Sequence, residues 1–422
     1  MRIAEDGNWR SFRHRNFRVL FPANVISNIG TWAQRIAQDW LVLELTHNNG
    51  AALGLVTSIQ FTPVLFFSLH GGALADKFDK RKLLVFTNLV GAAAAYVLGF
   101  LVISHNIQLW HVYLCAAVLG FSSALDAPIR QAFTSEIVGK SDLGNAISLN
   151  SANFNAGRLI GPGVSGLLIA RFGTGPSFII NATSFLFVIA SLLALRTSDL
   201  HIEKLEDTRG TIREGLRYAA ARPDLYVVMI IVFFAATFGL NFQIFNALMA
   251  TKVFHKGPAS YGVLGTYIAV GSLTGALLSA RLERLRSTLF IIRLAIIFSL
   301  VVVVLSFAPN YTAYSLWLPI CGVVALTMLV AANGYVQVNS DPAIRGRVMG
   351  IYLLIFMGGS PFGSLIIGWA SESVGTRTTI LICGLIAFIV SVTVLALYRE
   401  KVELPKDISV SGVLPGAYDD QR

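Results

Sequence analysis

Charged residues are scarce in this sequence, and their scarcity excludes an ordinary soluble protein. Of 422 residues, 33 are Lys or Arg and 23 are Asp or Glu, so only 13% are charged, against about 25% in soluble domains. Hydrophobic residues make up 55%, and a further 37 residues are glycine. Because a single water-soluble core stops growing at about 250 to 300 residues, we expect this chain to lie in a lipid bilayer.

Cysteine is also rare. Each of the three cysteines lies in an apolar run, which is typical of small buried side chains and not of a disulfide or metal site. They are Cys115, Cys321 and Cys383.

The common catalytic motifs are missing. The sequence contains no HExxH and no GxSxG, so it lacks the residues of metalloprotease or esterase chemistry. Gly139, Lys140 and Ser141 imitate the end of a phosphate-binding loop, but Thr134 stands where that loop needs its first glycine. We therefore predict that the protein is not an enzyme and binds no cofactor or metal.

Long runs without charge predict the membrane-spanning helices. Leu83–Leu125 and Leu294–Ser340 each hold two spans, which are separated at His105–Gln108 and at Ala308–Asn310. Five single spans and three less clean ones complete a total of twelve. These eight are Phe172–Leu195, Leu225–Thr251, Gly257–Ala280, Val348–Ser371, Thr378–Tyr398, Phe17–Leu45, Gly54–Ala75 and Asn145–Ala170.

The positions of the basic residues predict the orientation. If both termini are cytoplasmic, 25 of the 33 Lys and Arg residues fall in cytoplasmic segments, four fall outside and four lie within spans, as the positive-inside rule requires. The net charge of +10 is then a topology signal, and no nucleic-acid partner is expected. The N-terminus lacks the pattern of a removable signal peptide. We expect a multi-pass protein of the inner (plasma) membrane.

A charged segment divides the sequence into two halves of six spans. We predict one helical bundle over residues 1–195, a cytoplasmic linker over 196–224, a second bundle over 225–398 and a cytoplasmic tail over 399–422. Within the linker, Thr211–Ala221 has the pattern of a short amphipathic helix. When the sequences of the two halves are compared, Pro162 aligns with Pro361, and Asp76 aligns with Glu283. Two parallel repeats predict a transporter with its site between them near the bilayer midplane.

Four motifs carry a family resemblance. The sequence GALADKFDKRK, from Gly72 to Lys82, resembles the signature of the major facilitator superfamily between spans 2 and 3, and span 5 carries a glycine-proline pattern similar to that of antiporters. WLVLELT at the end of span 1 and DAPIRQAF after span 4 look most like the drug/proton antiporter branch that includes macrolide and tetracycline efflux pumps and the enterobactin exporter. The resemblance implies an all-α membrane fold of twelve helices in two pseudo-symmetric six-helix bundles.

The resemblance also implies a cytoplasmic gate. Asp76 would latch onto the start of span 11, where a helix N-terminus favours a carboxylate. The alternative is that the basic residues only set the orientation, and that the pair Asp126 and Arg130, at the cytoplasmic end of span 4, is structural. The gate candidates are Gly72, Asp76, Lys77, Lys80, Arg81, Lys82, Asp126 and Arg130.

Glycine and proline in spans 5 and 11 predict a hinge. Glycines four residues apart let a second helix approach closely, and a proline removes a backbone hydrogen bond and permits a bend. Helix packing alone is the alternative explanation for the glycines. The hinge candidates are Gly157, Gly161, Pro162, Gly166 and Pro361.

Three charged residues within the spans are candidates for proton coupling. Charges inside a bilayer are costly, so such residues are expected to be functional. Arg35 and Asp39 lie four apart on span 1 and can face each other, and Arg158 lies in span 5. We predict that Asp39 carries the proton; a static ion pair that fixes helix packing is the alternative.

Polar residues inside otherwise apolar spans predict the substrate cavity. Their mixture with phenylalanines favours an amphiphilic organic substrate over a sugar or a phosphate. The candidates are Asn24, Asn28, Gln34, Asn241, Gln243, Asn246, Asn333 and Gln337.

Together these features predict a monomeric secondary active transporter whose partners are the lipid bilayer, a small-molecule substrate and protons. Its function is predicted to be proton-coupled efflux of lipophilic or amphiphilic molecules by alternating access. A siderophore or metabolite exporter with the same machinery is the first alternative. A membrane-embedded sensor or scaffold is the second, although the sequence offers no soluble signalling domain.

Overall fold

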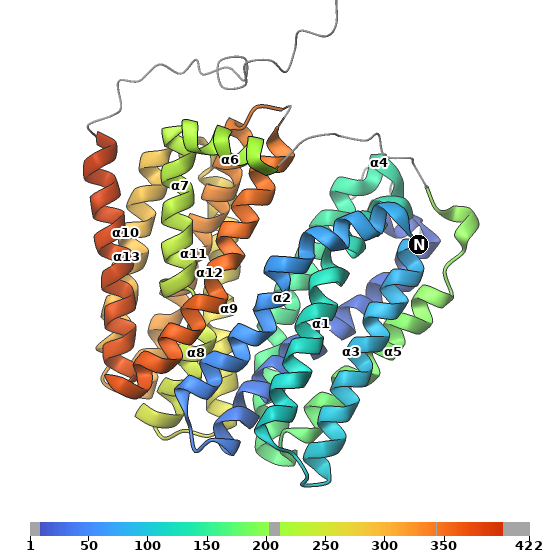
Figure 1. The fold of residues 1–422 in the computed structure, drawn as a ribbon, viewed down its shortest axis with the longest axis horizontal. Helices are drawn as coiled ribbons and strands as arrows, with labels where there is room; N and C mark the ends of the chain where they lie inside the picture. Colours follow the sequence, from blue (N-terminus) through green and yellow to red (C-terminus); the bar gives the residue numbers. More distant parts are fainter. Residues whose placement is uncertain (1–8, 202–211, 343, 400–422) are drawn as a thin grey trace, which may run out of the picture. The chain divides into compact units, whose positions relative to one another are not determined.

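The computed structural model describes residues 9–201, 212–342 and 344–399, which are almost entirely helical (Figure 1). The first half of the chain contains a short 3-10 turn and five long helices. These are η1 Arg10–Arg13, α1 Arg15–Leu45, α2 Gly50–Lys77, α3 Lys80–Ile103, α4 Leu109–Phe172 and α5 Gly175–Leu193.

The second half contains eight α-helices and several short turns. The helices are α6 Ile212–Ala221, α7 Pro223–Phe234, α8 Phe242–Leu248, α9 Pro258–Arg281, α10 Thr288–Ser306, α11 Tyr311–Asn339, α12 Arg345–Ser373 and α13 Thr376–Arg399. Two π-helical turns, η3 Ala235–Gly239 and η4 Met249–Val253, continue α7 and α8. Two 3-10 turns, η2 Thr197–Asp199 and η5 Glu283–Leu285, lie in connections.

Helix α4 is two membrane spans joined at Gly139. Its 64 residues would measure about 96 Å at 1.5 Å per residue, three times the thickness of a hydrocarbon core of about 30 Å. Gly139 interrupts it with φ 68° and ψ 175°, a conformation that only glycine adopts without strain. The chain therefore turns here between spans 4 and 5.

The described residues confirm the predicted set of spans. Ten segments are long and apolar enough to cross a bilayer, and the division of α4 at Gly139 makes eleven. Helix α1 is the twelfth, although its charged residues and its amide side chains, such as Asn24 and Asn28, make it less apolar than the other ten segments. The turns at His105–Gln108 and at Ala308–Asn310 fall between helices, as expected.

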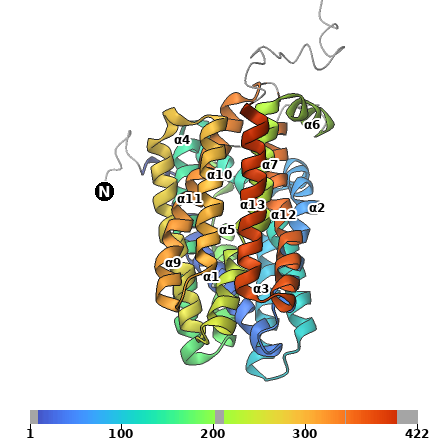
Figure 2. The ribbon, with the colours of Figure 1, turned by 90° about the vertical axis from the view of Figure 1, so that its left-hand side faces the viewer.

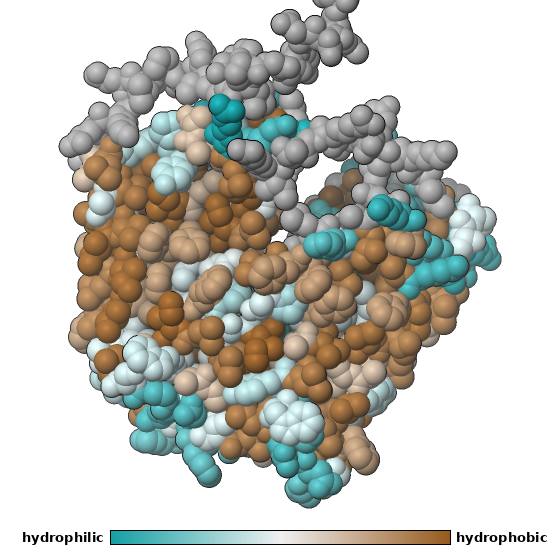
Figure 3. Space-filling view, in the orientation of Figure 1, coloured by the Kyte–Doolittle hydropathy of each residue, from teal (hydrophilic) through white to brown (hydrophobic). Residues whose placement is uncertain are grey.

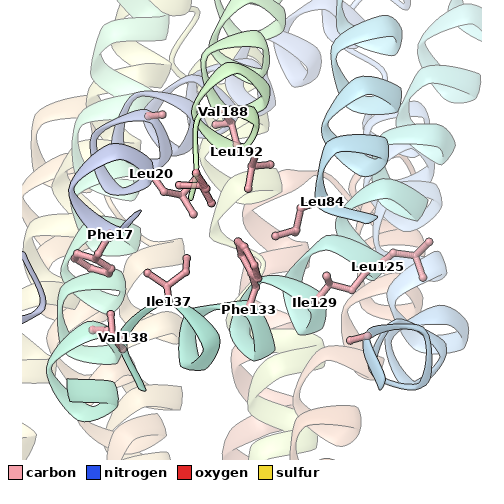
Figure 4. Close-up of a cluster of buried hydrophobic side chains, with 14 residues drawn as sticks. Phe17, Leu20, Leu84, Leu125, Ile129, Phe133, Ile137, Val138, Val188 and Leu192 are labelled. Atoms are coloured by element: carbon pink, nitrogen blue, oxygen red, sulfur yellow. The ribbon is translucent and has the colours of Figure 1, made fainter. Parts of the chain in front are cut away.

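The helices form two compact units. The first unit comprises Met1–Glu206 and Asn246–Ala269. Its core joins five helices, α1 to α5: in Figure 4, Ile129, Phe133 and Ile137 of α4 meet Leu84 of α3 and Leu192 of α5. Phe17 and Leu20 of α1 complete this cluster.

The second unit comprises Asp207–Phe245 and Val270–Arg422. Its helices α7, α10, α11 and α13 run alongside one another (Figure 2). The predicted linker helix is confirmed as α6, and Arg347 Nη1 of α12 donates to Glu214 Oε2 of α6 at 2.7 Å. Residues 202–211 and 400–422, which include parts of the predicted linker and tail, lie outside the described residues.

Large apolar side chains cover the lateral surfaces of the helices. Phe100, Leu167 and Trp369 are each exposed by about two thirds (68%, 67% and 68%), and Figure 3 shows apolar residues over the helix sides with hydrophilic ones gathered at their ends. Exposed apolar area of this extent needs a partner. Lipid tails supply it.

Candidate functional site

A cavity of about 610 Å³ lies within the first unit. Helix α1 lines it with Asn24, Asn28, Gln34 and Arg35, so all three of the polar candidates predicted on this helix reach it. Helices α2, α3, α4 and α5 supply the rest of the lining. Most of the lining side chains are polar, and the cavity therefore offers many hydrogen-bonding groups in an otherwise apolar protein.

Asp126 and Arg130 form an ion pair in the wall of this cavity. Arg130 Nε donates to Asp126 Oδ2 at 2.7 Å, and its Nη2 donates to Oδ1 at 2.9 Å. Thr87 and Asn88 of α3 also donate to Asp126 Oδ1, at 2.8 and 3.0 Å, and Arg130 Nη1 donates to Asn24 Oδ1 at 2.6 Å. Bidentate, charge-assisted pairs are strong and geometrically specific, so this network fixes α1, α3 and α4 to one another.

The position of this pair differs from the sequence-based expectation. The apolar run of span 4 ends at Leu125, which suggested that the pair lies at the end of the span. Helix α4 instead continues through Pro128 to the break at Gly139, so the pair lies about three turns inside the helix and faces the cavity. Its role as a gate stays a prediction.

Amide side chains form further pairs around the cavity. Asn181 Nδ2 of α5 donates to Gln34 Oε1 at 2.6 Å, and Asn28 Nδ2 donates to the Asn153 carbonyl oxygen at 2.7 Å. Gln38 Nε2 of α1 donates to Gln60 Oε1 of α2 at 3.1 Å. Because a buried polar group without a partner costs free energy, these pairs hold the cavity wall in one arrangement.

Asp39 is buried, with 2% of its surface exposed, and it accepts a hydrogen bond from Tyr261. The distance from Tyr261 Oη to Asp39 Oδ2 is 2.7 Å, and Tyr261 is itself buried. Tyr261 lies near the start of α9, in the segment Asn246–Ala269 that packs with the first unit. The acid predicted to carry the proton thus bonds to a residue 222 positions away.

Arg35 lies one helical turn from Asp39, and its charge is attracted to that carboxylate. Its guanidinium carbon is 4.7 Å from the centroid of the Trp32 ring and 5.5 Å from that of Phe61. Arg35 Nε is buried and finds no hydrogen-bond partner among the described residues. Stacking on aromatic faces is a common way to stabilise an arginine away from water.

Arg158, the third coupling candidate, lies in the second span of α4 and does not line the cavity. Within the described ranges it makes no hydrogen bond or ion pair. Its predicted sharing of Asp39 stays a prediction.

The span 5 glycines allow very close helix contacts. A Cβ atom at Gly161 would lie 2.5 Å from Trp32 Cβ of α1, and one at Gly166 would lie 2.8 Å from the Pro258 carbonyl oxygen. Real Cβ atoms do not approach other atoms so closely. Gly157 likewise lies directly against Asn28. These glycines are therefore needed for packing, and the hinge at Pro162 stays a prediction.

The second unit repeats this packing. Gly359 and Gly363, which flank Pro361 in α12, lie directly against Thr237 of η3. Span 11 thus packs on span 7 through a glycine pair, as span 5 packs on span 1. This correspondence supports the internal repeat seen in the sequence.

The basic cluster between spans 2 and 3 makes contacts within the first unit. Asp79 caps α3 by accepting from the Lys82 amide at 3.2 Å, Lys80 Nζ pairs with Glu136 Oε1 at 2.7 Å, and Arg81 Nη2 donates to the Leu193 carbonyl at 2.6 Å. These contacts tie α3 to α4 and α5.

The remaining gate candidates have fewer described contacts. Lys77 and Lys82 are exposed. Gly72 and Asp76 lie in α2, but their surroundings are outside what the structure describes.

The cavity candidates from the second half have different surroundings. Asn241 is buried, and its Nδ2 donates to the Thr237 carbonyl at 2.7 Å. Asn246 is buried, Gln243 and Asn333 are half-buried, and Gln337 is exposed. Their contact with a substrate stays a prediction.

Several residues of the site were not predicted from the sequence. Gln38, Gln60 and Asn88 are isolated polar residues within apolar spans, which is the same sequence signal that identifies Asn24. Tyr261 gives no such signal, because a tyrosine near a span end is common.

Membrane-spanning helices in two similarly packed sequence halves, with a polar cavity inside the first unit, are typical of a multi-pass transport protein. A family model described as "Transmembrane secretion effector" matches residues 6–412. The chain therefore belongs to this family of major facilitator transporters.

Comparison with curated proteins gives relatives of two kinds. The chain is 24% identical to the Staphyloferrin A transporter of Staphylococcus aureus (strain NCTC 8325 / PS 47), with 94% of this chain and 99% of the relative covered. It is 25% identical to the multidrug efflux pump Tap of Mycolicibacterium fortuitum (90% and 95% covered) and 22% identical to the enterobactin exporter EntS of Shigella flexneri (84% and 85%). The predicted likeness to drug and enterobactin exporters is confirmed.

Solved structures confirm the fold. A bacterial homologue of the human lysosomal transporter Spinster, solved in an inward-facing and unoccupied conformation, matches with a TM-score of 0.75 and 14% identity, covering 92% of this chain and 97% of that one. At this identity the match supports the major facilitator fold alone.

Proposed function

We propose that this protein is a proton-coupled exporter that carries amphiphilic small organic molecules across the cell membrane by alternating access. The observation that carries the proposal is the buried Asp39, which bonds to Tyr261 and lies on the helix that also lines the polar cavity. An ionisable group inside a bilayer costs free energy, so a buried one such as Asp39 is expected to serve a function.

Asp39 can couple protons to movement through its bond to Tyr261. The Tyr261 hydroxyl donates to the carboxylate, and a charge-assisted hydrogen bond of this kind stabilises the ionised form. Protonation removes the charge and weakens the contact between α1 and the start of α9. Helix separation would then follow proton binding, which is the link that an antiporter needs.

The other sequence-based roles are parts of the same proposal. The cluster around Asp76 would form the cytoplasmic gate, and Pro162 and Pro361 would act as hinges. Residues 1–195 and 225–398 would be the two moving bundles, joined by the linker 196–224, with both termini cytoplasmic and the protein monomeric. The non-transport alternative, a sensor or scaffold, is disfavoured because the family consists of transporters.

Export of a siderophore or another metabolite is the second candidate function. The polar lining of the cavity favours it, and two of the relatives are named for staphyloferrin A transport and enterobactin export. The machinery is the same in both cases, so the candidates differ only in the cargo.

The experiment that tests the proposal uses inverted membrane vesicles with a proton gradient. Compounds from a panel of amphiphilic cations, neutral molecules and carboxylates are added, and a pH-sensitive dye reports the protons that leave the vesicles as each substrate enters. We expect a response that requires the gradient but not ATP. No response to any compound would contradict the proposal.

Asp39→Asn provides the test of the coupling residue. We expect its response to fall to that of vesicles without the protein, because the amide cannot carry the proton. Glu44→Gln is the matched control, since Glu44 is an exposed acid five positions further along α1 that accepts a hydrogen bond from the Trp40 indole of the same helix. Normal gradient-driven transport by Asp39→Asn would exclude Asp39 as the carrier.

A further inference from the structure

We infer that the cavity of the first unit recognises a carboxylate group on a polar, hydroxyl-rich substrate, and that Arg35 is the residue that binds it. The inference rests on the proposed function in treating this cavity as the substrate site, and it favours the second candidate cargo, a siderophore or another metabolite, over an amphiphilic molecule. It adds the chemical class of the substrate and a role for Arg35 in recognition.

The first observation is the balance of charge in the cavity wall. Its charged lining residues are Arg35, Asp126 and Arg130. Asp126 and Arg130 neutralise each other through two hydrogen bonds of 2.7 and 2.9 Å. Arg35 is therefore the lining cation that has no acidic partner among the other lining residues.

The second observation is the unmet hydrogen-bonding capacity of Arg35. Its Nε is buried without a partner in the part of the chain that the structure describes, while the rings of Trp32 and Phe61 lie within 4.7 and 5.5 Å of its guanidinium carbon. Aromatic rings stabilise the charge of a guanidinium but accept none of its in-plane hydrogen bonds. The planar fork of donors is the arrangement that binds a carboxylate through two parallel bonds.

Asp39 does not supply the hydrogen-bond acceptors that the Arg35 guanidinium lacks. It attracts Arg35 electrostatically from one turn away, but it does not line the cavity, and its Oδ2 accepts the Tyr261 hydroxyl. A ligand carboxylate in the cavity can supply the acceptors that Arg35 needs.

The third observation concerns the rest of the lining. Ser, Thr, Asn and Gln side chains surround the cavity, and each can donate to or accept from a hydroxyl group. Among the lining residues that the structure describes, an organic cation would find no unpaired acid. The wall is thus suited to a hydroxylated anion and poorly suited to a lipophilic cation.

A matched series of three probes tests the charge preference. Gluconate, sorbitol and N-methylglucamine share a polyhydroxylated chain and differ in bearing a carboxylate, a hydroxyl or an ammonium group. The purified full-length protein in detergent is titrated with each at constant ionic strength. Binding is read as the rise in the Tm of unfolding with ligand concentration, with no proton gradient present.

We expect gluconate to raise the Tm and the other two probes to leave it unchanged. Arg35→Gln should weaken gluconate binding about tenfold or more, the effect of losing a charge-assisted hydrogen bond. Arg35→Lys, which keeps the charge and loses the fork, should bind with intermediate affinity. Arg18→Gln is the matched control, because Arg18 is an exposed arginine of the same helix that does not line the cavity.

Three results would overturn the inference. They are a response to N-methylglucamine equal to that of gluconate, gluconate binding unchanged in both Arg35 variants, and no response to gluconate. Inorganic phosphate is a further arm, and a stronger response to it would replace the carboxylate with a phosphate or lipid headgroup. If Arg35→Gln does not fold, Arg35→Lys decides.

The binding assay is independent of the transport assay. Arg35-dependent gluconate binding together with proton-independent transport would reject the coupling proposal and leave this inference standing. Proton-coupled transport without any preference for a carboxylate would support the coupling proposal and reject this inference.

Discussion

At the residue scale, the bond between Asp39 and Tyr261 is the contact on which the coupling proposal depends. Both side chains are buried, and the hydroxyl donates to the carboxylate over 2.7 Å. A single hydrogen bond to a charged group is worth about 1.5 to 3 kcal/mol, so its loss is large enough to change the transport rate.

Tyr261→Phe is expected to lower the rate of gradient-driven transport about tenfold. The variant keeps the ring and removes the hydroxyl that donates to Asp39, so the proposed link between Asp39 and the start of α9 is lost. The measurement is the initial rate of gradient-driven transport. Tyr267→Phe, on the same helix α9, is the control, and an unchanged rate in Tyr261→Phe would show that the bond is only structural.

The residues of the site differ in how far the sequence could identify them. Arg35 and Asp39 were evident because charges within an apolar span are rare and their spacing of four is local. Tyr261 was not evident, because the residues around it in the sequence do not indicate a contact with Asp39, which lies 222 positions earlier. Asp126 and Arg130 were identified as a pair, but the helix continues further than the apolar run suggested.

At the scale of helices, glycine and proline in α4 and α12 determine the closest contacts. Gly161 allows α1 to approach, and Gly166 allows the approach of α9 at Pro258. Pro162 lies between them and lacks the amide that would continue the helical hydrogen bonds. A helix that packs tightly on both sides of Pro162 but lacks a hydrogen bond at Pro162 is suited to bend at this residue.

Pro162→Ala in α4 removes the proposed bend, and it is expected to lower the transport rate severalfold while the amount of protein in the membrane stays near normal. Asp76→Asn in α2 removes the proposed latch, and the same result is expected for it. The measurements are transport by inverted vesicles and quantitative immunoblotting of the same membranes. Asp79→Asn is the control for charge, because asparagine caps a helix as well as aspartate, and a normal rate in either test variant would end its proposed role.

At the scale of the whole molecule, the distribution of charge predicts the orientation in the membrane. The positive-inside rule predicts that both termini and the loop at Gly139 lie on the cytoplasmic side, and that the turn at His105–Gln108 lies outside.

Single-cysteine labelling tests this orientation. The three native cysteines are buried and give little background. Asn106→Cys should react with a membrane-impermeant maleimide in intact cells, whereas Ser141→Cys should react only after the cells are permeabilised; both positions are exposed in the structure. The opposite pattern would reverse the orientation and the proposed direction of transport.

The sequence alone determined that the protein spans the membrane twelve times and contains an internal repeat, and its motifs identified the superfamily. These properties depend on local composition, since the bilayer selects apolar segments of fixed length and loop charges set their direction. The tertiary structure decided which polar groups meet: Asn24 with Arg130, Gln34 with Asn181, and Asp39 with Tyr261. Each of these pairs joins residues more than 100 positions apart, and only the packing of helices brings such side chains together.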